Sequence, residues 1–184
     1  MYRKLILVLA VASMISASLM SNRAIAIDRG VLELGVDGAF GVTDFEFSTS
    51  ATQIEFPARF RFGTFVSEKT SIDFGMRLSS FDQNSFFDQT TFAFDVGVGI
   101  HFTEKRTGTM GFVQPTVGLG YLKIGSFSGA QFAAGAEIGF KTIASSGLAG
   151  RFALFATRAF ENDKFVSSTT FGFLFGVSFF TINR

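Results

Sequence analysis

Residues 169–181 read TTFGFLFGVSFFT, and this stretch decides the fold of the chain. Side chains alternate between the two faces of a β-strand, so the stretch has one face of large apolar residues and one of small residues. The apolar face holds Phe171, Phe173, Phe175, Val177 and Phe179, and the other holds Gly172, Leu174, Gly176 and Ser178. Such a strand suits a soluble sandwich that buries its phenylalanines, or a strand whose outer face touches lipid.

The same alternation returns in seven earlier segments, and no segment has a sustained helical period. We therefore predict eight strands, at residues 31–41, 54–66, 71–79, 92–102, 112–123, 130–141, 150–160 and 169–181. In the fifth, Phe112 is out of phase and Pro115 cannot donate a ladder hydrogen bond, which predicts an irregular start. The seventh is the weakest, because Arg158 stands in the apolar phase. The fold class is predicted to be all-β.

Residues 1–26 are typical of a cleaved signal peptide. Arg3 and Lys4 give a basic start, an apolar run follows, and Ala24-Ile25-Ala26 is an A-x-A cleavage site. The apolar region is interrupted by serines and is shorter than the roughly 20 residues of a membrane-spanning helix. Cleavage after Ala26 would remove three basic residues and leave one domain at 27–184, with 13 basic and 15 acidic residues.

The composition excludes several classes of protein. The chain has no cysteine, which rules out disulfides and thiolate metal sites. Its charge is nearly neutral and has no basic cluster, so nucleic acid is not an expected partner. With 27 phenylalanines and only 17% charged residues, a water-soluble sandwich would have too much apolar surface. We favour a barrel in lipid, which supplies an apolar solvent and leaves no unpaired strand edge.

Charged residues and glycines occupy the second face of the predicted strands. An eight-stranded barrel is just wide enough for its inward side chains to fill, so glycines make room there and unlike charges must pair. We therefore predict a nearly balanced charge network in the lumen, made of Glu33, Asp37, Glu55, Arg59, Arg61, Asp73, Arg77, Asp95, Glu137, Lys141 and Arg151.

The connections differ in length. Residues 67–70 and 103–109 form short turns, whereas 42–53, 80–91 and 160–168 are longer, as in outer-membrane barrels with short periplasmic turns. The longer connections predict candidate surface contacts at Phe45, Phe47, Phe86, Phe87 and Phe165. The alternative is that some of these aromatic residues merely extend the strands.

These features resemble the small eight-stranded outer-membrane barrels, such as the outer membrane protein A barrel domain and the OmpX/Ail adhesion-type proteins. The resemblance implies an eight-stranded antiparallel up-and-down transmembrane β-barrel over the whole mature chain. It also implies that Gly176, Val177 and Phe179 are similar to the C-terminal signal that the barrel assembly machinery reads. Here Thr181 stands where a terminal aromatic residue is usual.

His101 is the only histidine and the only obvious general base. Some barrels of this kind are lipid A acylases or deacylases, in which a histidine acts with a nearby serine; here the neighbour is Thr103. The pair is predicted at the periplasmic end of its strand, on the wrong side for outer-leaflet lipid A. We favour a lumen or rim histidine that is hydrogen-bonded to a carboxylate.

The sequence thus predicts an exported outer-membrane barrel that is not an enzyme and needs no cofactor or metal. Its role would be structural or in cell-surface interaction, with outer-membrane lipid, the assembly machinery and an extracellular surface partner as its contacts. A narrow, porin-like pore for small solutes is the second hypothesis, and a lipid A-modifying enzyme is the third.

Overall fold

The computed structural model describes residues 29–45, 51–81, 89–103, 108–124, 127–143, 147–163 and 165–181. The proposed signal peptide lies outside these residues. Among the described residues, no helix is long and apolar enough to cross a membrane. The chain forms eight strands, namely β1 (Leu32–Phe45), β2 (Ala51–Ser67), β3 (Thr70–Phe81), β4 (Gln89–Thr103), β5 (Thr109–Ile124), β6 (Phe127–Ile143), β7 (Leu148–Ala159) and β8 (Ser168–Phe180).

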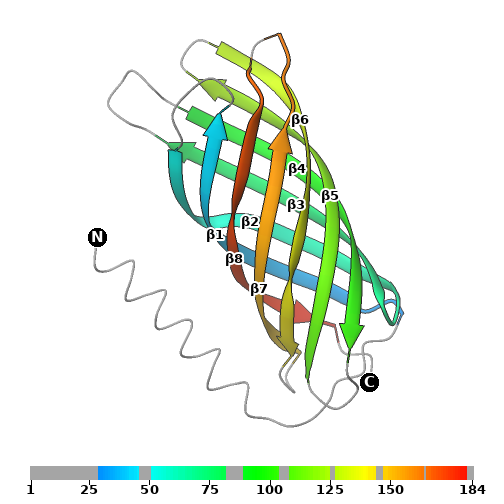
Figure 1. Cartoon of the computed structure of the whole chain (residues 1–184). Helices are drawn as coiled ribbons and strands as arrows, with labels where there is room; N and C mark the ends of the chain where they lie inside the picture. The colour runs from blue at the N-terminus through cyan, green and yellow to red at the C-terminus, as the bar shows by residue number, and fades with distance from the viewer. Residues whose placement is uncertain are drawn as a thin grey trace, which may run out of the picture.

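The strands pair in sequence order and close into an all-antiparallel barrel (Figure 1). The closing contact joins β1 to β8, from Glu33 opposite Phe180 to Phe45 opposite Ser168. All eight predicted strands and the all-β class are therefore confirmed. All strands except β8 are longer than predicted. For example, β1 reaches Phe45, β4 begins at Gln89 and β8 begins at Ser168, so part of each predicted long connection is strand.

The alternation of faces follows the sequence pattern. On β8, Phe171 and Phe179 point outward and are 54% and 62% exposed, whereas Leu174 and Ser178 point inward and are buried. Most large apolar side chains of the other strands are likewise exposed on the outside. Arg158 lies on the outward face of β7 and is also exposed, as its phase predicted.

The irregularity expected near the start of β5 is found in its ladder with β4, which is interrupted opposite Pro115 and Gln114. β5 pairs with β6 without interruption from Thr109 to Ile124, and Pro115 takes its place in that ladder. Phe112 is out of phase with the outward apolar residues of β5, as predicted, because its side chain points into the barrel and is 1% exposed. The register also shifts between β1 and β2, from Asp37 to Ala39, opposite the segment that contains Pro57. A further shift lies between β2 and β3, from Phe65 to Ser67.

The strand register inclines the strands to the barrel axis. A row of paired positions can be followed once round the barrel, starting at Leu34 on β1 and ending at Asp44, ten residues further along the same strand. Closing a barrel with such a stagger requires a strand tilt, typically of about 35–45°. Rows of neighbouring side chains therefore climb along the barrel as they pass from β1 towards β8.

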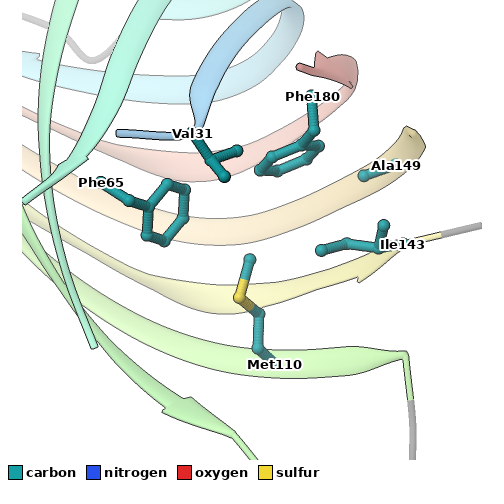
Figure 2. Packing of buried hydrophobic residues seen from close by; sticks show 6 residues of the cluster. All are labelled: Val31, Phe65, Met110, Ile143, Ala149 and Phe180. Carbon is teal, nitrogen blue, oxygen red and sulfur yellow. The ribbon is translucent and has the colours of Figure 1, made fainter. Parts of the chain in front are cut away.

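Two apolar clusters fill part of the interior. The first lies where β1 begins and β8 ends, and its side chains point towards one another from several strands (Figure 2). It consists of Val31, Phe65, Met110, Ile143, Ala149 and Phe180. The second consists of Ala39, Phe112, Ala153, Phe155 and Leu174. Apolar side chains therefore fill part of the lumen at the end where β1 begins.

Gly172 and Gly120 differ in how much space the barrel leaves for a side chain. A Cβ at Gly172 would lie 2.1 Å from the Phe40 carbonyl oxygen and 2.6 Å from Cα of Gly41, so backbone would have to move. At Gly120 the nearest atom is Cβ of Ala93 at 3.6 Å, an ordinary contact.

We expect Gly172→Ala to lower the free energy of unfolding by about 1–3 kcal/mol, the cost of overpacking. Gly120→Ala should leave it unchanged or raise it by about 0.4–1 kcal/mol, because the unfolded chain loses conformational freedom. Urea titration of both refolded variants, followed by circular dichroism, measures the difference. Equal stability of the two variants would contradict this account of β8.

Candidate functional site

A network of ion pairs lies inside the barrel. Eight ion pairs connect four cations with four carboxylates, and all of these side chains except that of Asp95 are at most 5% exposed. We call this set the lumen network; its members are Glu33, Asp37, Arg59, Arg61, Asp95, Glu137, Lys141 and Arg151.

Arg61 uses all three nitrogens of its guanidinium group. Its Nε donates to Oδ2 of Asp37 at 2.8 Å, and its Nη1 donates to Oε1 of Glu33 at 2.8 Å. Its Nη2 donates to Oγ of Ser178 at 2.8 Å, which brings β8 into the arrangement. Because the guanidinium is planar, three such bonds fix both its position and its orientation.

Arg59 spans the lumen from β2. Its Nη1 donates to Oε1 of Glu137 on β6 at 2.7 Å and to Oδ1 of Asp95 on β4 at 3.3 Å. Its Nη2 donates to Oδ2 of Asp37 on β1 at 3.2 Å. Arg59 therefore connects β2 with three other strands. Two of these, β4 and β6, are not neighbours of β2 in the barrel.

Two further cations complete the lumen network. Lys141 donates from Nζ to Oε2 of Glu33 at 2.6 Å. Arg151 donates from Nη1 to Oδ2 of Asp37 at 3.2 Å and from Nη2 to Oε2 of Glu137. Oδ2 of Asp37 thus accepts from three arginines, which makes this carboxylate the centre of the network.

Phe112 lies against the cationic side of the network. Its ring centroid is 4.7 Å from Cζ of Arg151 and 5.4 Å from Nζ of Lys141. Cations are attracted to the face of an aromatic ring, and the attraction is stronger where water is excluded. This contact explains why a phenylalanine occupies an inward position among charges.

The lumen network crosses the barrel and balances its own charge. It connects β1, β2, β4, β6 and β7, including pairs of strands with no backbone ladder between them. Four positive and four negative groups neutralise one another, which offsets much of the cost of removing each from water. Oδ1 of Asp37 and the Nε atoms of Arg59 and Arg151 have no hydrogen-bond partner among the described residues. Chemically, the arrangement can brace the barrel wall and obstruct the passage of solute.

Two described members of the predicted charge set do not join this network. Asp73 and Arg77 point inward on β3, but no ion pair of either is found among the described residues, and the Arg77 Nε has no hydrogen-bond partner there. The side chain of Glu55 lies outside the described part of the chain. Ser178 does join the network, although the prediction did not include it; its place on the inward face of β8 was the available signal.

His101 belongs to a separate buried cluster. The Ser71 Oγ donates to Oδ2 of Asp73 at 2.7 Å and lies 2.9 Å from Nε2 of His101. Since the hydroxyl has one proton and gives it to the carboxylate, the Nε2–H of the imidazole donates to Oγ. All three side chains are at most 1% exposed. The contact of His101 is therefore a serine, and the expected carboxylate is one hydrogen bond further away.

This cluster is poorly arranged for nucleophilic catalysis. A serine nucleophile must donate its proton to the base, whereas Ser71 donates to Asp73 and is 0% exposed. Ser71 was not among the predicted site residues, although period two from Asp73 places it on the inward face. The side chain of Thr103 is outside the described residues. Within the described ranges, no group of three or more His, Cys, Asp or Glu side chains could hold a metal ion.

The predicted surface and assembly residues are only partly described. Phe47, Phe86 and Phe87 lie outside the described residues, and Phe45 is the last residue of β1, so it is strand and not loop. Phe165 is half-buried, and its backbone N–H donates to Oδ1 of Asn162 at 2.9 Å.

Gly176, Val177 and Phe179 lie on β8, opposite Asp37, Val36 and Leu34 of β1. Just past β8, Thr181 donates from its backbone N–H to the Leu32 carbonyl oxygen at 2.9 Å. The Leu32 N–H donates in turn to Oγ1 of Thr181 at 2.9 Å. Thr181 therefore fastens the end of β8 to the start of β1.

No protein-family model matches the sequence, and no curated protein matches it. Solved structures match by shape. Neisserial surface protein A has 10% sequence identity and a TM-score of 0.65, over 82% of this chain and 98% of its own. The attachment invasion locus protein Ail of Yersinia pestis, in complex with the heparin analogue sucrose octasulfate, has 10% identity and a TM-score of 0.51, over 83% and 99%.

The outer membrane protein AlkL, solved in DMPC lipid bilayers, has 11% identity and a TM-score of 0.52, over 88% of this chain and 95% of its own. At sequence identities this low, the similarity shows a shared fold and does not show a shared activity. By its fold, the chain is a small eight-stranded β-barrel of the outer-membrane type, as the resemblance predicted.

Proposed function

We propose that this chain is a non-enzymatic β-barrel of the outer membrane with a structural or cell-surface interaction role. The observation that carries the proposal is the lumen network, eight ion pairs that occupy the interior where a pore or an active site would need space. Buried ion pairs of this kind brace the wall of the barrel.

Placement in the outer membrane is supported by the outward face. Side chains such as Leu78, Leu119 and Phe179 are 61–62% exposed, and similar apolar residues surround the barrel. Soluble monomers rarely expose apolar patches larger than a few hundred Å². We propose that residues 1–26 direct export and are cleaved, and that 27–184 is the barrel domain. We also propose that Gly176, Val177 and Phe179 are read by the barrel assembly machinery.

The absence of catalysis is part of the proposal. His101 and Ser71 are buried within the barrel and engaged with each other, and Asp73 takes the serine proton. A surface role would instead depend on the ends of the strands that face outside the cell. Ail, one of the solved barrels of similar shape, was crystallised with a heparin analogue, and this chain is proposed to meet an extracellular partner of its own.

Conductance in planar bilayers tests the proposal. We expect the refolded mature protein to give small or undetectable current steps, because the lumen network obstructs the interior. The double variant Arg59→Ala/Glu137→Ala removes one pair of unlike charges and should increase conductance. The matched double variant Asp44→Ala/Lys123→Ala removes exposed charges on the outward face and should not.

Large, stable current steps from the unmodified protein would favour the pore hypothesis. A lipid A deacylation assay on the same preparation tests the enzyme hypothesis. Release of fatty acid that is abolished by His101→Ala would overturn the non-enzymatic assignment.

A further inference from the structure

A groove of about 420 Å³ lies on the outward face of the barrel, across β8, β1, β2, β3 and β4. The side chains that line it belong to the outward, apolar set, so the groove is separate from the lumen. Neither the lumen network nor the His101 cluster contributes a side chain to its walls.

One wall of the groove is a row of paired positions on four neighbouring strands. The strand register places them side by side, and their exposed fractions range from 44% to 62%. The row consists of Phe179, Leu34, Phe62 and Phe74.

The other wall is the next outward row, two residues away on each strand. It extends one strand further, because its last member lies on β4. This row consists of Val177, Val36, Phe60, Met76 and Phe94.

The two walls of the groove are two residues apart along each strand. Two residues along a strand correspond to roughly 6.6 Å, and crossing five strands means four spacings of about 4.8 Å, or about 19 Å. Between the rows, Gly35, Arg61 and Gly75 are inward positions, so backbone forms the floor. The result is a long, narrow and uncharged slot.

The slot is inclined along the barrel. It starts near Phe179, where β8 ends and β1 begins, and reaches Phe94, in the middle part of β4. Because paired rows climb from β1 towards β4, the slot rises from one end of the barrel towards its middle. In the proposed placement that end is periplasmic, and the middle of the barrel is the bilayer midplane.

We propose that this slot holds one acyl chain of a phospholipid from the periplasmic leaflet. The inference rests on the proposed membrane placement. An acyl chain is long, thin and uncharged, and it extends from the membrane surface to the midplane, as the slot does. A second copy of the barrel fits less well. A stable dimer needs roughly 800 Å² per partner, and two convex barrels would meet along the crests of the walls and leave the slot unfilled.

Native mass spectrometry of the mature protein, taken from palmitoyl-oleoyl phosphatidylethanolamine bilayers into detergent, tests the proposal. Val36 and Val177 are paired across β1 and β8 in the slot, so Val36→Phe/Val177→Phe should fill it. Val96 and Val117 are paired, outward-facing valines outside the slot, so Val96→Phe/Val117→Phe is the matched control. We expect the parent and control proteins to retain one phospholipid and the slot variant to lose it.

Three results would overturn the proposal: no retained phospholipid on the parent, equal retention by both double variants, or a dimer that only the slot variant disrupts. Unheated and boiled gel samples confirm that each variant is folded. A nitroxide label on the outward face separates this proposal from the proposed function. If a water-soluble quencher reaches the label, the membrane placement fails; if only a lipid-soluble quencher does and no phospholipid is retained, the slot proposal alone fails.

Discussion

Asp37→Ala is expected to lower the free energy of unfolding of the barrel by about 3–5 kcal/mol, enough to prevent refolding if the parent is marginally stable. Oδ2 of Asp37 accepts from Arg59, Arg61 and Arg151, and all four side chains are at most 4% exposed. Without this carboxylate, the lumen network has four cations and three acids. Each cation keeps at least one ion pair, but the dry interior then has one positive charge in excess. Urea titration of protein refolded in detergent or liposomes measures the change.

Two variants separate the charge of Asp37 from its shape. Asp37→Asn keeps the size and one acceptor oxygen, so it should be less harmful than the alanine variant but still well below the parent. Asp44→Ala removes an acid from the outward, exposed face of the same strand and should change stability by no more than about 0.5 kcal/mol. A stability loss at Asp44 as large as that at Asp37 would show that the lumen network is not what stabilises the barrel.

The barrel itself could be predicted from the sequence because both of its faces leave a period-two signal. Phe94 and Asp95 are neighbours in sequence, and one is 52% exposed while the side chain of the other is 22% exposed and paired with Arg59. Strand ends were less predictable. The alternation of apolar and polar residues weakens towards the strand ends, although backbone pairing continues to Phe45 on β1.

The composition of the interior was predictable, but its pairings were not. Which inward acid meets which cation depends on the register and tilt of the closed barrel, and Arg59 reaches Glu137 from a strand four places away round the barrel. Inward aromatic residues were a second difficulty. Phe112 fits no lipid-facing pattern, because its place is set by the cationic groups of Lys141 and Arg151 beside its ring.

Phe94→Arg is expected to cost about 2–4 kcal/mol if the side chain lies near the bilayer midplane, because an outward arginine must then enter hydrocarbon. Phe94 is exposed on β4 and packs edge-to-face on Phe92, with ring centroids 4.6 Å apart. Asp95→Ala should cost less, on the order of 1 kcal/mol, because Arg59 keeps Asp37 and Glu137 as partners. Reversible unfolding in liposomes measures both, and the predicted order is Phe94→Arg below Asp95→Ala below the parent.

Spin labels at the same two positions test which face meets lipid, and they do so without a measurement of stability. The chain has no cysteine, so Phe94→Cys and Asp95→Cys each give one labelling site. Oxygen, which concentrates in lipid, should broaden the signal at position 94 and have little effect at position 95, since the backbone of β4 separates the two environments. A label at 95 that responds more to oxygen than the label at 94 would mean that the lumen network faces lipid. The apolar groove and the low conductance would then both lose their basis, because each depends on the same inside and outside.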